Sequence, residues 1–166
     1  MAPLIVLILV TILARLAGLI GLPALQKWPA ATRVGLSVMF CFTAAAHFNS
    51  MRGDLVRMVP PSVPNPEFMV TFTGICEILG AIGLLVPRTR RVASVALILF
   101  LLAVLPANIH AAQAGVTIGG SSATPLVPRV LLQLLFIGLV WWTGLARGGE
   151  RRERSGRRDR EPPQPQ

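Results

Sequence analysis

The sequence predicts an all-α polytopic membrane helical bundle, and three observations support this fold class. The apolar residues form five long continuous segments. The chain is 53% hydrophobic and 14% charged, with a mean hydropathy of +0.64, which lies outside the usual range for soluble proteins. The segments also lack the short alternating pattern of barrel strands. Each is therefore expected to cross the bilayer as a helix that satisfies its own backbone hydrogen bonds.

The first apolar segment covers residues 3–25 and contains Arg15. A cleaved secretory signal carries basic residues before its apolar core and small residues at the cleavage site after it. Here no basic residue precedes the segment, and Lys27 and Arg33 follow it. We expect a retained helix. A cleaved signal is the alternative, and it would leave the other helices as assigned.

The remaining four segments cover residues 34–48, 67–86, 92–111 and 130–146. The tight basic connection at residues 87–91 joins the third segment to the fourth, so these two helices are expected to pack as an antiparallel hairpin. The fifth segment contains Trp141 and Trp142 near its end, and tryptophan favours the headgroup region of a membrane.

These segments predict three regions along the chain. Residues 1–30 form an N-terminal transmembrane helix, and residues 31–146 form a four-helix membrane bundle. Residues 147–166 form a basic tail whose composition cannot bury enough apolar surface to fold, so we expect it to be disordered.

The basic residues are distributed unevenly between the two sides of the membrane. One side receives Arg15, Lys27, Arg33, Arg88, Arg90, Arg91 and the seven arginines from Arg147 onward, whereas the other receives Arg52, Arg57 and Arg129. Because basic loops favour the cytoplasm, we expect a multi-pass plasma-membrane protein with its N-terminus outside and its C-terminus cytoplasmic. The net charge of +9 then reflects orientation and anionic lipid rather than a nucleic-acid partner.

The two outer loops of this topology cover residues 49–66 and 112–129. The first is rich in proline at residues 59–66. Proline favours extended conformations and removes amide donors, so this stretch is predicted to be a stiff connector along the outer surface.

Glu77 is the most informative single residue, because it lies near the middle of the third segment. A carboxylate at that depth is costly, so it is expected to face the bundle interior or to be protonated. Thr73, Gly74, Gly80 and Ala81 fall on the same helical face, which is typical of close helix packing. Glu77 is a candidate proton relay or ligand-binding carboxylate, and interhelical packing is the alternative.

Four further polar residues gather toward the outer ends of their helices: His47, Asn108, His110 and Gln133. If they converge with Glu77, the bundle holds a polar cavity suited to a quinone-like head group, a proton path or a small polar solute. The alternative is that the histidines are interfacial side chains and that Asn108 satisfies backbone groups freed by Pro106.

Cys41 and Cys76 both lie within apolar segments, without C-x-x-C or metal-ligand spacing. They are predicted to act as small apolar residues, and no metal site is expected. Catalytic residues cannot be assigned, because the chain shows no nucleotide-binding loop and no nucleophile–base pair.

A series of motifs along the chain resembles the DoxX-like family of small bacterial membrane proteins. The series comprises His47-Phe48, the proline-rich stretch 59–66, Thr73-Gly74, Glu77-Ile78, Gly83-Leu84-Leu85, residues 87–91 and Pro106-Ala107-Asn108-Ile109. The resemblance covers about residues 33–145 and implies a four-helix core, to which the first helix would be an addition. His47, Glu77 and Asn108 stand at the family's recurrent polar positions.

The resemblance implies a link to quinone-coupled or thiol redox systems. Together with the deep carboxylate, it suggests an accessory subunit that binds a quinone-like or other small ligand for a membrane redox partner protein. Two alternatives are a small proton-coupled transporter or channel and a structural or assembly protein without a ligand. An enzyme is the weaker interpretation, and it would be an oxidoreductase-associated subunit. The sequence does not determine the oligomeric state.

Overall fold

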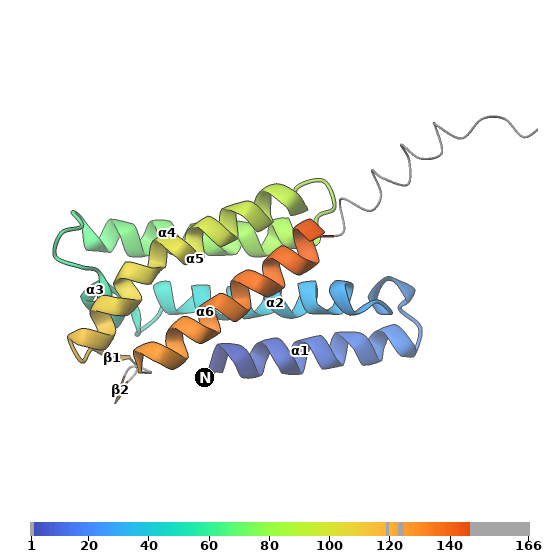
Figure 1. Ribbon diagram of the computed structural model, residues 1–166, viewed down its shortest axis with the longest axis horizontal. Coiled ribbons are helices and arrows are strands. Elements are labelled where there is room, and N and C mark those ends of the chain that lie inside the picture. Colours follow the sequence, from blue (N-terminus) through green and yellow to red (C-terminus); the bar gives the residue numbers. More distant parts are fainter. Residues whose placement is uncertain (1, 119, 123–124, 147–166) are drawn as a thin grey trace, which may run out of the picture.

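The computed structural model describes residues 2–118, 120–122 and 125–146, and it confirms the all-α fold class (Figure 1). Within these residues the α-helices are α1 (Ala2–Leu19), α2 (Trp28–Ala44), α3 (Arg52–Met58), α4 (Pro66–Leu85), α5 (Arg90–Gln113) and α6 (Leu126–Trp141). Short 3-10 turns at Pro23–Leu25 and Ala45–His47 flank α2, and a π-helical turn at Trp142–Ala146 extends α6.

Among the residues that the structure describes, five helical segments are long and apolar enough to cross a membrane. They are Ala2–Leu19, Trp28–His47, Pro66–Leu85, Arg90–Gln113 and Leu126–Ala146. Their outward faces carry large apolar side chains, and Leu9, Leu79 and Leu99 are each more than half exposed. An apolar surface that continues over several helices matches lipid rather than water. The chain is therefore a multi-pass membrane protein.

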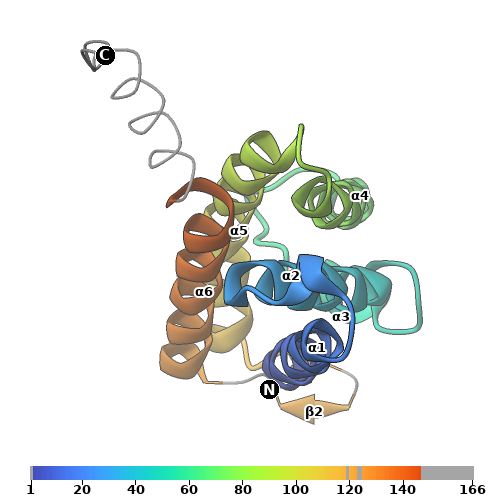
Figure 2. The same cartoon turned by 90° about the vertical axis from the view of Figure 1, so that its right-hand side faces the viewer.

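Helix α2 lies at the centre of the bundle, between α1 on one side and α4 on the other (Figure 2). It also contacts α6, while α4, α5 and α6 pack on one another in chain order. Helix α1 contacts chiefly α2, so it is peripheral to the other long helices. One core nevertheless joins all five: Leu7, Leu36, Met39, Phe40, Ala81, Leu84, Leu97, Leu101 and Val140.

Small residues on α4 allow α2 and α5 to approach it closely. A Cβ atom added to Gly80 would lie 2.5 Å from a methyl carbon of Leu97 on α5. On the α2 side, the hydroxyl of Ser37 donates a hydrogen bond of 2.7 Å to the carbonyl of the fully buried Ala81. The small-residue face predicted for this helix is thus the face that packs against its neighbours.

Helices α4 and α5 form the predicted antiparallel hairpin. Their connection is closed by the hydroxyl of Thr89, which donates to the carbonyl of Gly83 at 3.2 Å. A Cβ atom added to Gly83 would lie 2.6 Å from the Cβ of Ala93, so the two helices are in close contact from the turn onward.

The connection between α1 and α2 lies earlier in the chain than the apolar pattern predicted, at residues 20–27 instead of 26–33. Helix α1 ends at Leu19, because Gly21 adopts a φ of 140° and Pro23 opens a 3-10 turn. Helix α2 then begins at Trp28, ahead of the predicted segment. Pro29 lies in its first turn, where the missing amide is not needed.

The two loops at residues 49–66 and 112–129 contain structure that the sequence analysis did not predict. The first includes α3, and its proline-rich stretch turns back on itself instead of running as a stiff extended connector. The amide of Val63 donates to the carbonyl of Pro60 at 3.0 Å, and Asn65 is left-handed with a φ of 50°. A proline φ near −65° suits a turn as well as an extended chain.

The second loop contains a short antiparallel hairpin, β1 (Thr117–Ile118) and β2 (Ser121–Ser122). The tail at residues 147–166 lies outside the described residues.

Candidate functional site

Glu77 is buried between α4 and α2, with 5% of its surface exposed, and its predicted inward orientation is confirmed. Its Oε1 atom accepts a hydrogen bond of 2.5 Å from the hydroxyl of Thr43 on α2. That hydroxyl also lies 3.1 Å from the carbonyl oxygens of Met39 and Phe40, which are its alternative acceptors within the helix. The Thr43 hydroxyl therefore has an acceptor on α4 in addition to the backbone carbonyls of its own helix.

His47 stands on the other side of the carboxylate. Its Nε2 atom lies 3.5 Å from Oε2 of Glu77. Its Nδ1 atom lies 2.7 Å from the carbonyl oxygen of Val70 and 3.4 Å from the hydroxyl of Thr73. A ring nitrogen this close to a carbonyl oxygen must carry a proton, so the hydrogen-bond pattern assigns Nδ1 as a donor.

This assignment has a chemical consequence for the contact between His47 and Glu77. In a neutral imidazole with Nδ1 protonated, Nε2 is an acceptor, and an ionised carboxylate is also an acceptor. Two acceptors that face each other in a low-dielectric interior repel, whereas one proton between them makes the contact favourable. The pair is therefore suited to holding one proton, on either the carboxyl group or the imidazole.

The site is built from two facing pairs of residues four apart in sequence. Thr43 and His47 follow one face of α2 and its last 3-10 turn, and Thr73 and Glu77 follow one face of α4. Because these helices run antiparallel, Thr43 meets Glu77 while His47 meets Thr73. Gly74 makes the approach possible, since a Cβ atom at that position would lie 2.7 Å from the Cβ of His47.

Arg52 of α3 binds to both helices at the end of this arrangement nearest α3. Its Nη1 atom donates to the carbonyl of His47 at 3.2 Å, and its Nη2 atom donates to the carbonyl of Glu67 at 3.0 Å. The last turn of α2 and the first turn of α4 are thus joined through one guanidinium group. The His47 side chain is 15% exposed and that of Glu77 is 7% exposed, so the imidazole is the more accessible member of the pair.

A second polar group joins α5 to α6. Arg129 donates to Oδ1 of Asn108 at 3.1 Å, and Nδ2 of Asn108 donates to Oε1 of Gln133 at 3.1 Å. The buried Gln133 in turn donates to the carbonyl of Leu101. This position is close to Pro106, which interrupts the backbone hydrogen bonds of α5. Asn108 bonds to the side chains of Arg129 and Gln133, whereas Gln133 also donates to a backbone carbonyl of α5.

The structure thus divides the candidate residues instead of gathering them into one cavity. It brings His47 to Glu77 and joins Asn108 to Gln133, and no hydrogen bond or ion pair between described residues connects the two groups. His110, half-buried in the last turn of α5, belongs to neither group. Cys41 and Cys76 are both free thiols.

Sequence reasoning missed Thr43, Arg52 and Arg129 as members of these groups. The spacing of Thr43 four residues before His47 was the available signal, because it places both side chains on one helical face. The two arginines were counted only as markers of topology. Their contacts depend on the folded loop and on helix pairing, which the pattern of the sequence does not specify.

The family model described as "Domain of unknown function (DUF8561)" matches residues 36–144. The match begins within α2 and ends within the π-helical turn, so it includes both polar groups and leaves α1 outside. No curated protein and no solved structure matches the chain.

Proposed function

The chain belongs to the DUF8561 family, and we propose that it is an accessory subunit of a membrane redox system that binds a quinone-like head group at Glu77 and His47. The observation that carries the proposal is the contact of 3.5 Å between His47 Nε2 and Glu77 Oε2, with Nδ1 already committed to Val70. Such a pair holds one proton and can release it. A quinone head group needs this property, because its carbonyl acceptors become hydroxyl donors when it is reduced.

The roles of the two residues follow from their positions. The proton held between them is donated to a carbonyl oxygen of the oxidised head group, and the vacated pair accepts a hydrogen bond from a hydroxyl of the reduced one. Reduction takes up two electrons, which the redox partner protein supplies, and two protons, of which this pair supplies one and the outer aqueous phase the other. Thr43 holds the carboxylate in place through Oε1 and leaves Oε2 toward His47.

Two further observations support the proposal. The motif series that includes His47, Glu77 and Asn108 resembles the DoxX-like family, which is associated with quinone-coupled oxidation. In addition, the more exposed imidazole lies toward the end of α2 that carries the outer loops, where a head group would enter between helices from the membrane. In this proposal electron transfer belongs to the partner, and the chain itself need not be an enzyme.

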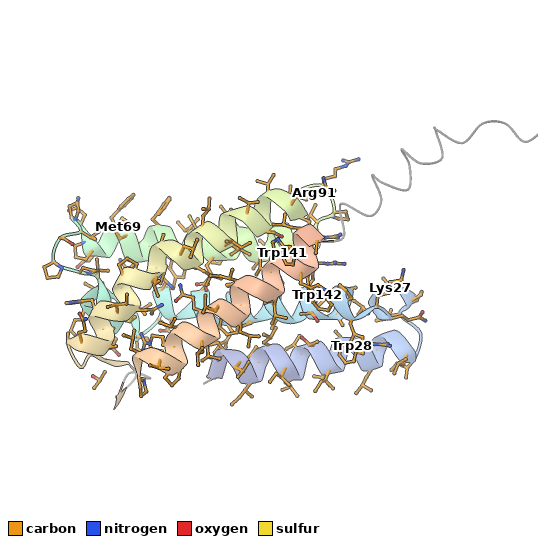
Figure 3. All side chains as sticks on the ribbon, in the orientation of Figure 1. Lys27, Trp28, Met69, Arg91, Trp141 and Trp142 are labelled. Atoms are coloured by element: carbon orange, nitrogen blue, oxygen red, sulfur yellow. The ribbon has the colours of Figure 1, made fainter. Side chains whose placement is uncertain are left out.

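The proposal includes a topology in the plasma membrane. The N-terminus is outside, residues 1–30 form a peripheral transmembrane helix, residues 31–146 form the bundle and the basic tail is cytoplasmic. Lys27, Arg91, Trp141 and Trp142 lie at one end of the molecule, opposite Met69 (Figure 3). Clustering of basic and tryptophan side chains at one end favours that end as the cytoplasmic surface.

Binding of decylubiquinone and menadione to the full chain in lipid nanodiscs, measured by equilibrium dialysis, tests the proposal. Replacing Glu77 with glutamine keeps the shape of the side chain but removes its ionisable carboxyl proton. We expect Glu77→Gln and His47→Gln to weaken the binding of either probe by about tenfold or more, as for the loss of a hydrogen bond to a charged group. Glu67→Gln is the matched control, because Glu67 is an exposed glutamate on the same helix. Unchanged binding by Glu77→Gln, or an equal loss in Glu67→Gln, would contradict the proposal.

Proton-coupled transport is the second candidate function. The observation in its favour is the line of polar groups Thr73, His47, Glu77 and Thr43, which leads from the outer part of the bundle toward its middle. Proton uptake by proteoliposomes that contain the chain but no quinone distinguishes the two functions. Uptake that Glu77→Gln abolishes would favour the transporter, and its absence together with quinone binding would favour the accessory subunit.

A further inference from the structure

Arg15 is a permanently charged residue inside the first membrane span, and the acidic residues that the structure describes belong to α3 and α4. It lies four residues before the end of α1, which is about 6 Å along the helix axis. The first acidic residue of the chain is Asp54 in α3, at the opposite end of the molecule (Figure 1). Glu67 and Glu77 belong to α4. The hairpin of α1 and α2 therefore contains no carboxylate that could neutralise this guanidinium.

The geometry around Arg15 leaves hydrogen-bond donors without acceptors. Its guanidinium carbon lies 5.5 Å from the ring centroid of Trp28, the first residue of α2. Its Nε and Nη1 atoms are enclosed, and neither has a hydrogen-bond partner among the described residues. Nη2 is not one of these enclosed atoms without a partner. The aromatic face stabilises the positive charge but accepts no hydrogen bond in the plane of the guanidinium.

The fold holds Arg15 and Trp28 together through the backbone. Gly18, one turn after Arg15, lets the α1–α2 connection fold back onto the helix. A Cβ atom at this position would lie 2.6 Å from the carbonyl carbon of Leu25. This close approach returns the chain to α1 just before Trp28 begins α2. Trp28 is 55% exposed, as expected for an indole that meets lipid headgroups on one side.

We infer that Arg15 and Trp28 form a binding site for the phosphate of an anionic membrane lipid, at the membrane surface where α1 ends and α2 begins. A guanidinium stays charged at every physiological pH and presents a planar fork of donors that fits phosphate. A long arginine side chain this close to a helix end reaches the headgroup level, where lipid phosphates are the abundant acceptors. The Trp28 ring lies 5.5 Å from the guanidinium carbon and stabilises its charge at the level of the headgroups. This inference is independent of the function proposed for Glu77.

Native mass spectrometry of the full chain in detergent, titrated with phosphatidylglycerol or phosphatidylcholine, tests the inference. We expect the wild-type chain to retain phosphatidylglycerol in preference to phosphatidylcholine. Arg15→Gln is expected to weaken the first phosphatidylglycerol binding step by about five- to tenfold. Trp28→Leu keeps the charge but removes the aromatic face, and it is expected to weaken that step by about two- to fivefold.

Lys27→Gln is the matched control, because it removes the same charge from the residue beside Trp28 at the same end of the molecule (Figure 3). It should leave the first binding step within about twofold of the wild type. Gel filtration and circular dichroism establish which variants fold. Should Arg15→Gln fail to fold, Trp28→Leu carries the test with the charge intact.

Several results would overturn the inference. These are equal binding by Arg15→Gln and the wild type, an equal loss in Lys27→Gln, or equal retention of both lipids. Competition by inorganic phosphate at millimolar concentration would assign the site to a free anion instead of a lipid. The tail contains four acidic residues, Glu150, Glu153, Asp159 and Glu161. If changing them to amides abolished the effect of Arg15→Gln, the tail would be the partner of Arg15, and the lipid site would be excluded.

Discussion

Replacing Phe40 with alanine is expected to destabilise the folded bundle by about 2–4 kcal/mol. Phe40 is 1% exposed and packs in the core shared by α1, α2, α4, α5 and α6. In a membrane the side chain leaves lipid rather than water when the bundle forms. The loss therefore comes from the empty volume and the missing dispersion contacts rather than from hydration. Reversible unfolding in mixed micelles of increasing dodecyl sulfate content measures this change in free energy.

Phe42 provides the control for this prediction. It lies two residues further along α2, and 50% of its surface is exposed, so in a membrane it faces lipid. Position 42 contacts lipid in both the wild type and Phe42→Ala. We therefore expect the substitution to change the free energy of unfolding by less than about 0.5 kcal/mol. A loss in Phe42→Ala as large as in Phe40→Ala would show that the bundle is packed or oriented differently.

Replacing Gly74 with valine is expected to destabilise the bundle by about 1–3 kcal/mol and to separate His47 from Glu77. The added Cβ would lie 2.7 Å from the Cβ of His47, 2.9 Å from its Cγ and 3.0 Å from a ring carbon of Phe48. The His47 Cβ cannot move without the backbone of the last turn of α2. The imidazole must therefore shift away from Val70 and Glu77. The unfolding free energy and the ¹⁵N chemical shifts of the His47 ring are the two measurements.

Gly138→Val is the matched control for the Gly74 variant. Gly138 is also a glycine within a long helix, but an added Cβ would meet nothing within 4 Å. The helical propensity changes equally in both variants, so the difference between them reports the contact with His47. Unchanged ¹⁵N chemical shifts of the His47 ring in Gly74→Val would contradict the distance of 2.7 Å between an added Cβ at position 74 and the Cβ of His47. They would mean that α2 and α4 lie further apart.

The long helices could be predicted from the sequence because lipid imposes one rule on each of them. Every spanning segment must be apolar and must satisfy its own backbone, so segment length and composition suffice. The inward orientation of Glu77 followed from the same rule. The end of α1 could not be predicted from this rule, because residues 20–25 continue the apolar segment. The helix ends there because of the backbone geometry of Gly21 and the 3-10 turn that begins at Pro23.

The partners of the buried polar residues could not be predicted in the same way. Threonine in a membrane helix commonly donates to a carbonyl of its own helix, as Thr71 does, so residue type alone does not identify Thr43 as a partner of Glu77. The pairing of Asn108 with Gln133 depends on the relative rotation of α5 and α6. Helix α3 is only seven residues long and contains a glycine, so its pattern is too short to identify.

The central claim is that His47 and Glu77 meet inside the membrane, and solid-state NMR measures this contact most directly. The chain is labelled with ¹⁵N-histidine and with ¹³C at the glutamate carboxyl, in lipid bilayers, and His110→Gln removes the other histidine. The account predicts dipolar coupling between the His47 Nε2 nitrogen and a glutamate carboxyl carbon, which Glu77→Gln abolishes and Glu67→Gln leaves intact. A spectrum without this coupling, or a coupling that persists in Glu77→Gln, would contradict the account.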